Sequence, residues 1–186
     1  MNQKFKTSLA FAKNLMVTGA ISETSRYVEV NICKHISKEP NKVIVEFGTG
    51  HGNITREILN TMSNSSILYS FEVNKDFCEY VRETIQDERL VIINDGAENL
   101  KKHVKKPINS VISSIPFTFF SKEKGLSIIQ NAYDLLEEGC YYSQALYTKF
   151  NFKKFQKIFD HCTLITHKNL ITEYIYYCKK TNEKQQ

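Results

Sequence analysis

Three glycines at alternate positions, Gly48, Gly50 and Gly52, constrain the fold of this chain more than any other feature of its sequence. The apolar run at 43–45 before them is typical of a buried strand, and residues 54–59 after them are typical of a helix. Glycine lets the backbone turn tightly and lets a ligand approach without meeting a Cβ atom, while the start of the helix offers N–H groups to negative charge. The pattern predicts a strand, a turn and a helix with a ligand close to the backbone; a turn that binds nothing is the alternative.

After this turn, strand and helix patterns alternate regularly, which is typical of a parallel sheet covered by helices on both faces. The pattern predicts strands at 66–73, 89–94, 108–115 and 140–147, and helices at 74–85 and 122–139. Residues 161–180 contain two β-rich runs joined at 167–169, which indicates an antiparallel hairpin at the edge of the sheet. We therefore expect an α/β, Rossmann-like fold.

The first 40 residues have a pattern of their own. Apolar residues recur at helical spacing with lysines among them, which predicts a basic amphipathic helix that packs on the domain, covers the site or lies on a membrane surface: Phe5, Leu9, Ala12 and Met16 with Lys4, Lys6 and Lys13. A second helix is expected from about 25 to 36, capped by Ser22 or Thr24. We expect an N-terminal helical extension at 1–40, one catalytic domain at 41–180 and a disordered tail at 181–186.

Composition restricts the class of protein further. The chain has 186 residues, of which 41% are hydrophobic, and this suits one domain with a sizeable core. Its formal charge of +5 is spread over mixed-charge segments, so nucleic-acid binding is not indicated. The five cysteines form no Cys-x-x-Cys pair, which predicts reduced thiols and no metal site. Neither a membrane-length apolar run nor a signal-peptide pattern is present, so we expect a cytoplasmic location, with peripheral contact to the inner face of the membrane.

The spacing of the glycines separates two classes of nucleotide ligand. The dinucleotide fingerprint needs its third glycine at position 53, where this chain has Asn53. The stretch from Glu46 to Gly52 instead resembles motif I of the class I S-adenosylmethionine-dependent methyltransferases. The resemblance implies that Glu72, at the end of the second strand, binds the ribose hydroxyls, and that Asp95 accepts a hydrogen bond from the adenine amino group. It implies S-adenosylmethionine as cofactor, S-adenosylhomocysteine as product, and these cofactor-binding residues: Glu46, Phe47, Gly48, Thr49, Gly50, Gly52, Asn53, Glu72, Val73, Asp95, Gly96, Ala97 and Ser113.

The two ends of the chain and the stretch SSIPFTFFS resemble bacterial phospholipid N-methyltransferases, which methylate the amine of phosphatidylethanolamine. In that family the N-terminal motif reads Pro-Ser-Ser where this chain has residues 23–25, Glu-Thr-Ser. The resemblance implies a phospholipid or other amphipathic acceptor and a membrane surface as partners, with no protein partner implied. The residues expected at the reacting groups are Glu23, Tyr27, Ser114, Pro116, Phe117 and Tyr147.

Three alternatives remain open. The rRNA adenine dimethyltransferases read Asn-Leu-Pro-Tyr after the fourth strand, where this chain reads Ser114, Ile115, Pro116 and Phe117. Serine weakens the contact to the exocyclic amine of the base and phenylalanine keeps only stacking, so nucleic acid is the less expected acceptor. A small soluble acceptor is the second alternative. A module that holds the cofactor without turnover is the third, and the complete glycine motif with Glu72 and Asp95 argues against it.

Overall fold

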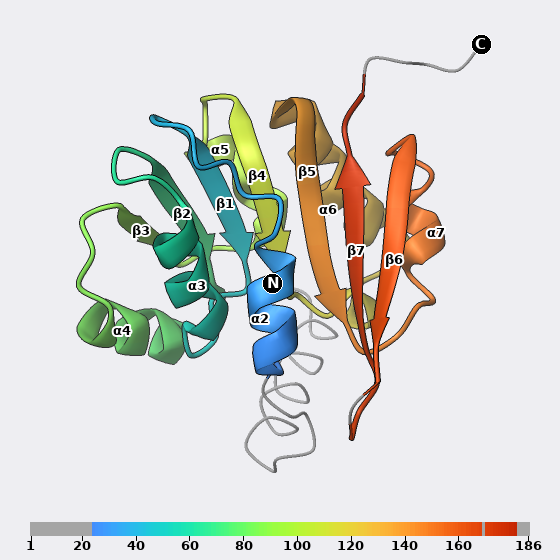
Figure 1. The fold of residues 1–186 in the computed structure, drawn as a ribbon, viewed down its shortest axis with the longest axis horizontal. Coiled ribbons are helices and arrows are strands. Elements are labelled where there is room, and N and C mark those ends of the chain that lie inside the picture. The colour runs from blue at the N-terminus through green and yellow to red at the C-terminus, as the bar shows by residue number, and fades with distance from the viewer. Residues whose placement is uncertain (1–23, 169, 182–186) are drawn as a thin grey trace.

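The computed structural model describes residues 24–168 and 170–181, which form a seven-stranded sheet with helices on both faces (Figure 1). The strands are β1 (Val43–Phe47), β2 (Ile67–Phe71), β3 (Leu90–Ile93), β4 (Ile108–Ser113), β5 (Leu136–Leu146), β6 (His161–His167) and β7 (Glu173–Lys179). The α-helices are α2 (Arg26–Ile32), α3 (Asn53–Thr61), α4 (Lys75–Thr84), α5 (Leu100–His103), α6 (Lys122–Leu135) and α7 (Phe152–Phe155), and two 3-10 turns are η1 (Ala97–Asn99) and η2 (Phe117–Phe119). The predicted amphipathic helix, Glu23 and the last five residues lie outside the described residues.

The order of the strands across the sheet is β3-β2-β1-β4-β5-β7-β6. Strands β1 to β5 run parallel to one another, with Val45 of β1 opposite Tyr69 on one side and Val111 on the other. Strand β7 is antiparallel to both β5 and β6. These pairings confirm the predicted α/β sheet with its C-terminal antiparallel hairpin.

The two faces of the sheet are buried under different helices, as the period of two along a strand requires. In β1, Val43, Val45 and Phe47 pack into a cluster with residues of α6, whereas Ile44 packs into a second cluster with residues of α2 and α3. Figure 1 shows α2 and α3 in front of the sheet and α5 and α6 behind it. Glu46 alternates with its neighbours and therefore lies on the face of Ile44.

Two predicted boundaries are wrong. The helix predicted to reach Gly139 ends at Leu135, and β5 begins at Leu136 because that residue pairs with Ile108 of β4. Gly139 lies inside the strand with a φ of +76°, beside an irregularity in the register. The second N-terminal helix ends at Ile32 instead of 36, and its cap is Ser25.

Within residues 24–168 and 170–181, no helix is long and apolar enough to cross a membrane.

Candidate functional site

The residues singled out in the sequence gather at one edge of the sheet. Strands β1 to β5 are parallel, so the turns at their carboxyl ends meet there, which is where open α/β sheets bind ligands. The glycine turn follows β1, Glu72 follows β2 and Asp95 follows β3. The loop with the sequence SSIPF, residues 113–117, begins at the end of β4, and Tyr147 directly follows β5. Strand β7 begins at the same edge, because its Tyr174 pairs with Leu146 of β5.

The three glycines differ in what surrounds them in the turn, although all three have positive φ angles of +90°, +52° and +82°. A Cβ atom on Gly48 would lie 3.1 Å from Ile115 Cγ2 and from Ser114 Oγ, so this glycine lets the loop after β4 pack against the turn. A Cβ atom on Gly52 would lie 2.8 Å from Ile85 Cδ1, so this glycine lets α3 pack against the end of α4. A Cβ atom on Gly50 would have no atom of the described residues within 4 Å beyond its chain neighbours. Gly50 is therefore the glycine at which a ligand can approach the backbone.

Glu46 ends up buried behind the turn, with 1% of its surface exposed. Its Oε2 accepts hydrogen bonds from Thr55 Oγ1 at 2.8 Å and Ser70 Oγ at 2.6 Å, while its Oε1 has no hydrogen-bond partner among the described residues. Burial raises the pKa of Glu46 to about 8, against the lowering effect of the two hydroxyl donors, and the charge of Glu72 raises it further. Glu46 thus joins β1, β2 and α3 beneath the turn and retains one carboxyl oxygen, Oε1, without a hydrogen-bond partner among the described residues.

Glu72 links the turn after β2 to the glycine turn. Its Oε2 accepts a hydrogen bond from the backbone N–H of Gly50 at 3.1 Å, and its Oε1 accepts one from Asn74 N–H at 2.8 Å. Burial raises the pKa of this carboxyl group, and the backbone donors act in the opposite direction. The side chain therefore lies beside Gly50, as a ribose-binding carboxylate would have to.

The remaining residues of the predicted cofactor set near β1 and β2 are mostly structural in their contacts. Phe47 is fully buried, with its ring edge-on to Phe71 at 5.7 Å between centroids. Thr49 is buried, and its hydroxyl bonds to the hydroxyl of Ser70. Asn53 is half-buried as the first residue of α3, and Val73 is 37% exposed beside Glu72.

The carboxylate of Asp95 is bound by residues that follow it closely in the chain. Its carboxylate accepts hydrogen bonds from the backbone N–H of Gly96 at 2.8 Å and from the amide of Asn99 at 2.7 Å, and His103 Nε2 lies 2.8 Å from its Oδ2. The hydrogen bond with His103 is the main cause that lowers the pKa of Asp95 to about 2, so the carboxylate is ionised at neutral pH. These contacts fix the turn that carries Gly96 and the buried Ala97.

The loop after β4 is fastened to the glycine turn. Ser114 Oγ donates a hydrogen bond to the carbonyl of Gly48 at 3.0 Å, and the amide of Gln144 in β5 donates one to the carbonyl of Ile115 at 3.2 Å. Ser113, the last residue of β4, is fully buried. Pro116 caps η2, and Phe117 is fully buried, with its ring edge-on to two other phenylalanines at 5.8 and 5.4 Å: Phe120 and Phe155.

The other predicted residues near the reacting groups lie where α2 meets the C-terminal hairpin. Tyr27 stacks on His167 with 4.0 Å between ring centroids. Burial, followed by the charge of Glu173, raises the pKa of Tyr147, and a hydrogen bond with Thr24 opposes this rise. The structure brings Tyr27 and Tyr147 to the carboxyl edge of the sheet, while Glu23 lies outside the described residues.

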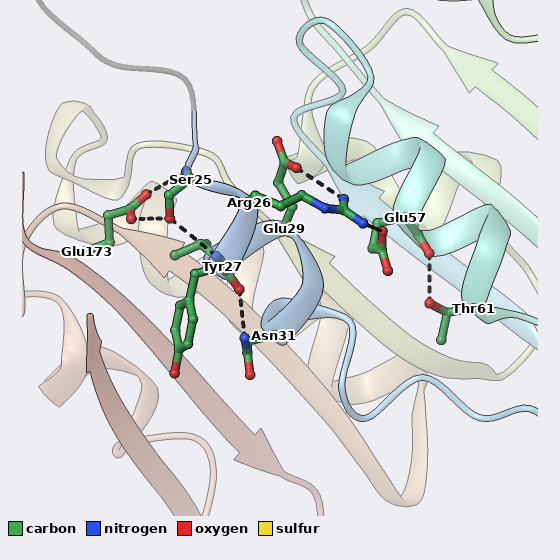
Figure 2. A network of polar contacts seen from close by, with 9 residues as sticks. Ser25, Arg26, Tyr27, Glu29, Asn31, Glu57, Thr61 and Glu173 are labelled. Atoms are coloured by element: carbon green, nitrogen blue, oxygen red, sulfur yellow. Dashed lines mark hydrogen bonds and ion pairs between the residues drawn. The ribbon is translucent and has the colours of Figure 1, made fainter. Parts of the chain in front are cut away.

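The sequence did not reveal a contact that holds α2 at this edge. Figure 2 shows Ser25 facing Glu173: the backbone N–H of Ser25 donates to Glu173 Oε1 at 2.9 Å, and its hydroxyl donates to Oε2. The same figure shows Arg26 between two carboxylates, with Glu57 of α3 at 2.6 Å and Glu29 at 3.3 Å. Ser25 and Glu173 are 148 residues apart in the chain, and no local pattern could have paired them.

Comparison with known proteins shows which family this chain belongs to. A family model described as ribosomal RNA adenine dimethylase matches residues 21–122. The chain belongs to the ribosomal RNA adenine dimethylase family. This membership confirms the predicted enzyme class, an S-adenosylmethionine-dependent methyltransferase, and the predicted cofactor.

Two relatives with curated names are methyltransferases, and one of the two names specifies an acceptor. An ornithine lipid N-methyltransferase from Singulisphaera acidiphila is 21% identical over 180 residues, which cover 93% of this chain and 94% of that protein. An uncharacterized methyltransferase from Geobacillus sp. is 26% identical over 109 residues, which cover 59% of this chain and about half, 49%, of that protein. Among solved structures, a methyltransferase from Streptococcus mutans in complex with S-adenosylhomocysteine shares the fold, with a TM-score of 0.65, 18% identity, and coverage of 84% of this chain and 99% of that one.

The described residues fit this cofactor in chemical terms. The open approach at Gly50 accepts a ligand against the backbone, and the carboxylate of Glu72 beside it suits ribose hydroxyls. The oxygen Oε1 of Glu46, which has no partner among the described residues, lies behind the same turn, where it can hydrogen-bond to a ligand directly or through water. The cofactor-binding roles of the individual residues remain predictions.

Proposed function

We propose that this chain transfers a methyl group from S-adenosylmethionine to the amine of a lipid head group such as that of phosphatidylethanolamine. The observation that carries the proposal is the loop after β4. The hydroxyl of Ser114 is committed to the carbonyl of Gly48, and the ring of Phe117 is buried among other phenylalanines. A ring packed in the core does not offer a face on which a nucleobase could stack, and the hydroxyl replaces the amide that would bind the amine of adenine.

The resemblance over nearly the whole chain to a protein named as an ornithine lipid N-methyltransferase supports the same class of acceptor. Phe119 and Phe120, which follow Phe117 and are only partly buried, also favour a cationic amine over a carboxylate or hydroxyl acceptor, since aromatic faces attract cations. Phe120 is half-buried and already has Lys124 Nζ 5.2 Å from its ring centroid, so a cation is compatible with that ring.

In this mechanism the chain mainly aligns its two reactants and excludes water. The bound cofactor supplies an activated methyl group as a sulfonium. The acceptor amine would lose its proton to solvent before it enters the site, and the neutral nitrogen would then accept the methyl group, with S-adenosylhomocysteine as the leaving group. The raised pKa of Tyr147 keeps its phenol neutral at pH 7, so we assign it a hydrogen bond to the head group and not the role of a base.

Methylation of an adenine in ribosomal RNA is the second candidate, because the family model that matches residues 21–122 is described by that activity. One experiment compares the two acceptors. The intact chain is incubated with methyl-labelled S-adenosylmethionine and either vesicles containing phosphatidylethanolamine or unmodified ribosomal RNA, and label is measured in the lipid and RNA fractions. We expect label in the lipid and none in the RNA. Label in the RNA alone, or in neither fraction while the chain still binds S-adenosylhomocysteine, would remove the lipid proposal.

A further inference from the structure

An exposed surface at the carboxyl edge of the sheet combines lysines with large apolar side chains. We call it the basic rim; it consists of Lys149, Phe150 and Lys153 after β5, and Lys168, Leu170 and Ile171 in the turn between β6 and β7. Phe150 is 85% exposed, Leu170 is 99% exposed and Ile171 is 39% exposed. Exposed apolar residues are common when scattered singly, but a group of them among lysines at one edge points to a partner.

The two segments of the basic rim leave the sheet at the same edge. Leu146, where β5 ends, pairs with Tyr174 near the start of β7, and Thr166 near the end of β6 pairs with the same tyrosine. The hydroxyl of Tyr176 in β7 donates to the carbonyl of Thr148 at 2.6 Å, which ties the chain after β5 to the hairpin. In Figure 1 the turn between β6 and β7 projects beyond the rest of the sheet on this side. Tyr147 and the start of α2 belong to the same edge.

The charged side chains of the basic rim are all positive. Residues 147–159 contain four lysines and no acidic residue. Within the described part of the chain, no ion pair joins Lys149, Lys153 or Lys168 to a carboxylate. The lysines are thus available to anionic groups of a partner.

The apolar members of the rim decide which anionic partner fits. A single-stranded nucleic acid would need aromatic faces on which its bases can stack. Phe150 alone could provide such a face, because Leu170 and Ile171 are aliphatic, whereas the head-group boundary of a bilayer accepts leucine, isoleucine and phenylalanine alike. Lysines beside them are attracted to anionic lipids.

We propose that the basic rim docks on the surface of an anionic bilayer, with Phe150 and Leu170 in the head-group boundary and the three lysines facing anionic head groups. The inference extends the proposed function and rests on it: a lipid amine could then reach the site near Tyr147 without leaving the membrane.

The test uses the intact chain and vesicles of phosphatidylethanolamine with phosphatidylglycerol, measured by sedimentation at low salt. One variant carries Lys149→Gln, Lys153→Gln and Lys168→Gln. Since a lysine near an anionic surface contributes about fivefold to binding, we expect a loss of about a hundredfold. A matched control removes the same charge at the opposite edge of the sheet, before β1 and β4, by changing Lys38, Lys105 and Lys106 to Gln, and we expect it to bind like the unaltered chain.

A second variant, Phe150→Ala with Leu170→Ala, keeps the charge and removes the apolar contact. We expect its binding to fall about tenfold or more, because both side chains would lose their place in the head-group boundary. Equal binding by this variant, by the lysine variant and by the unaltered chain would overturn the proposal. Binding of single-stranded RNA that falls in the same variants, with no binding to vesicles, would overturn it in favour of a nucleic-acid surface.

Methylation of a short-chain, dispersed phosphatidylethanolamine distinguishes this inference from the proposed function. If dispersed lipid is methylated but vesicles are not bound, the docking surface fails and the activity stands. If vesicles are bound through the basic rim but no lipid amine is methylated in either form, the activity fails and the docking surface stands.

Discussion

At the residue scale, the positive φ angles alone do not tell which glycine faces the ligand. Gly50 and Gly139 both have φ angles in the left-handed region, +52° and +76°, and at both a Cβ atom would have no described atom within 4 Å beyond its chain neighbours. The two differ in location, because Gly50 lies in the turn beside Glu72 and Gly139 lies in β5, far along the chain from that turn. This pair allows backbone strain to be separated from obstruction of the ligand.

We expect Gly50→Val and Gly139→Val to lower the free energy of unfolding by similar amounts, about 1–2 kcal/mol or more, because each forces a side chain into a left-handed backbone. Only Gly50→Val should abolish binding of S-adenosylhomocysteine, since its side chain enters the open approach to the turn. Denaturant unfolding measures the first effect and titration calorimetry the second. Tight binding by Gly50→Val would show that the cofactor does not lie against this turn.

At the element scale, α2 is only seven residues long and depends on contacts outside itself. Ser25 caps it, with its side chain accepting from Val28 N–H, and also gives two donors to the buried carboxylate of Glu173. Ser121 caps α6 in the same way, through Lys124 N–H. Each serine therefore makes the same kind of capping hydrogen bond in its own helix, and Ser25 in addition contacts Glu173 of β7.

We expect Ser121→Ala to lower the free energy of unfolding by about 1 kcal/mol, the usual cost of a lost cap. Ser25→Ala should lower it by about 2–4 kcal/mol, because a buried charged acceptor also loses a hydrogen bond. Urea unfolding of both variants measures the difference. Equal losses would mean that Glu173 adds nothing to the position of α2.

Most elements could be predicted from the sequence because their apolar periods are set by burial on the faces of the sheet. The junction of α6 and β5 could not, since residues 135–138 continue the helical pattern and only the pairing of Leu136 with Ile108 makes them a strand. In the site, Glu72 and Asp95 could be placed at this edge because each follows a strand, and Glu46 of β1 is singled out by the resemblance to motif I. Their partners could not: the contact of Asp95 with His103 depends on how the chain after β3 closes on itself.

At the scale of the whole molecule, the buried Glu46 couples folding to pH. Its pKa is about 8 in the folded chain and about 4.5 in the unfolded chain. Above pH 4.5 the unfolded chain releases this proton while the folded chain still holds it, so ionisation favours unfolding. The contribution of Glu46 to stability is therefore largest below about pH 4.5 and is lost as the pH rises to about 8, where it levels off.

We expect the free energy of unfolding of the chain to fall between pH 5 and pH 8, with a contribution from Glu46 on the order of several kcal/mol. Glu46→Gln keeps the size of the side chain and an oxygen that can accept from Thr55 or Ser70, but it cannot ionise. Because every other titrating group is shared, the difference between the two proteins isolates this one carboxyl group. Urea unfolding at pH 5, 6.5 and 8 should show the variant gaining stability relative to the unaltered chain as the pH rises. Parallel profiles would mean that Glu46 is ionised in the folded chain at neutral pH, and that its negative charge stands behind the glycine turn when the cofactor binds.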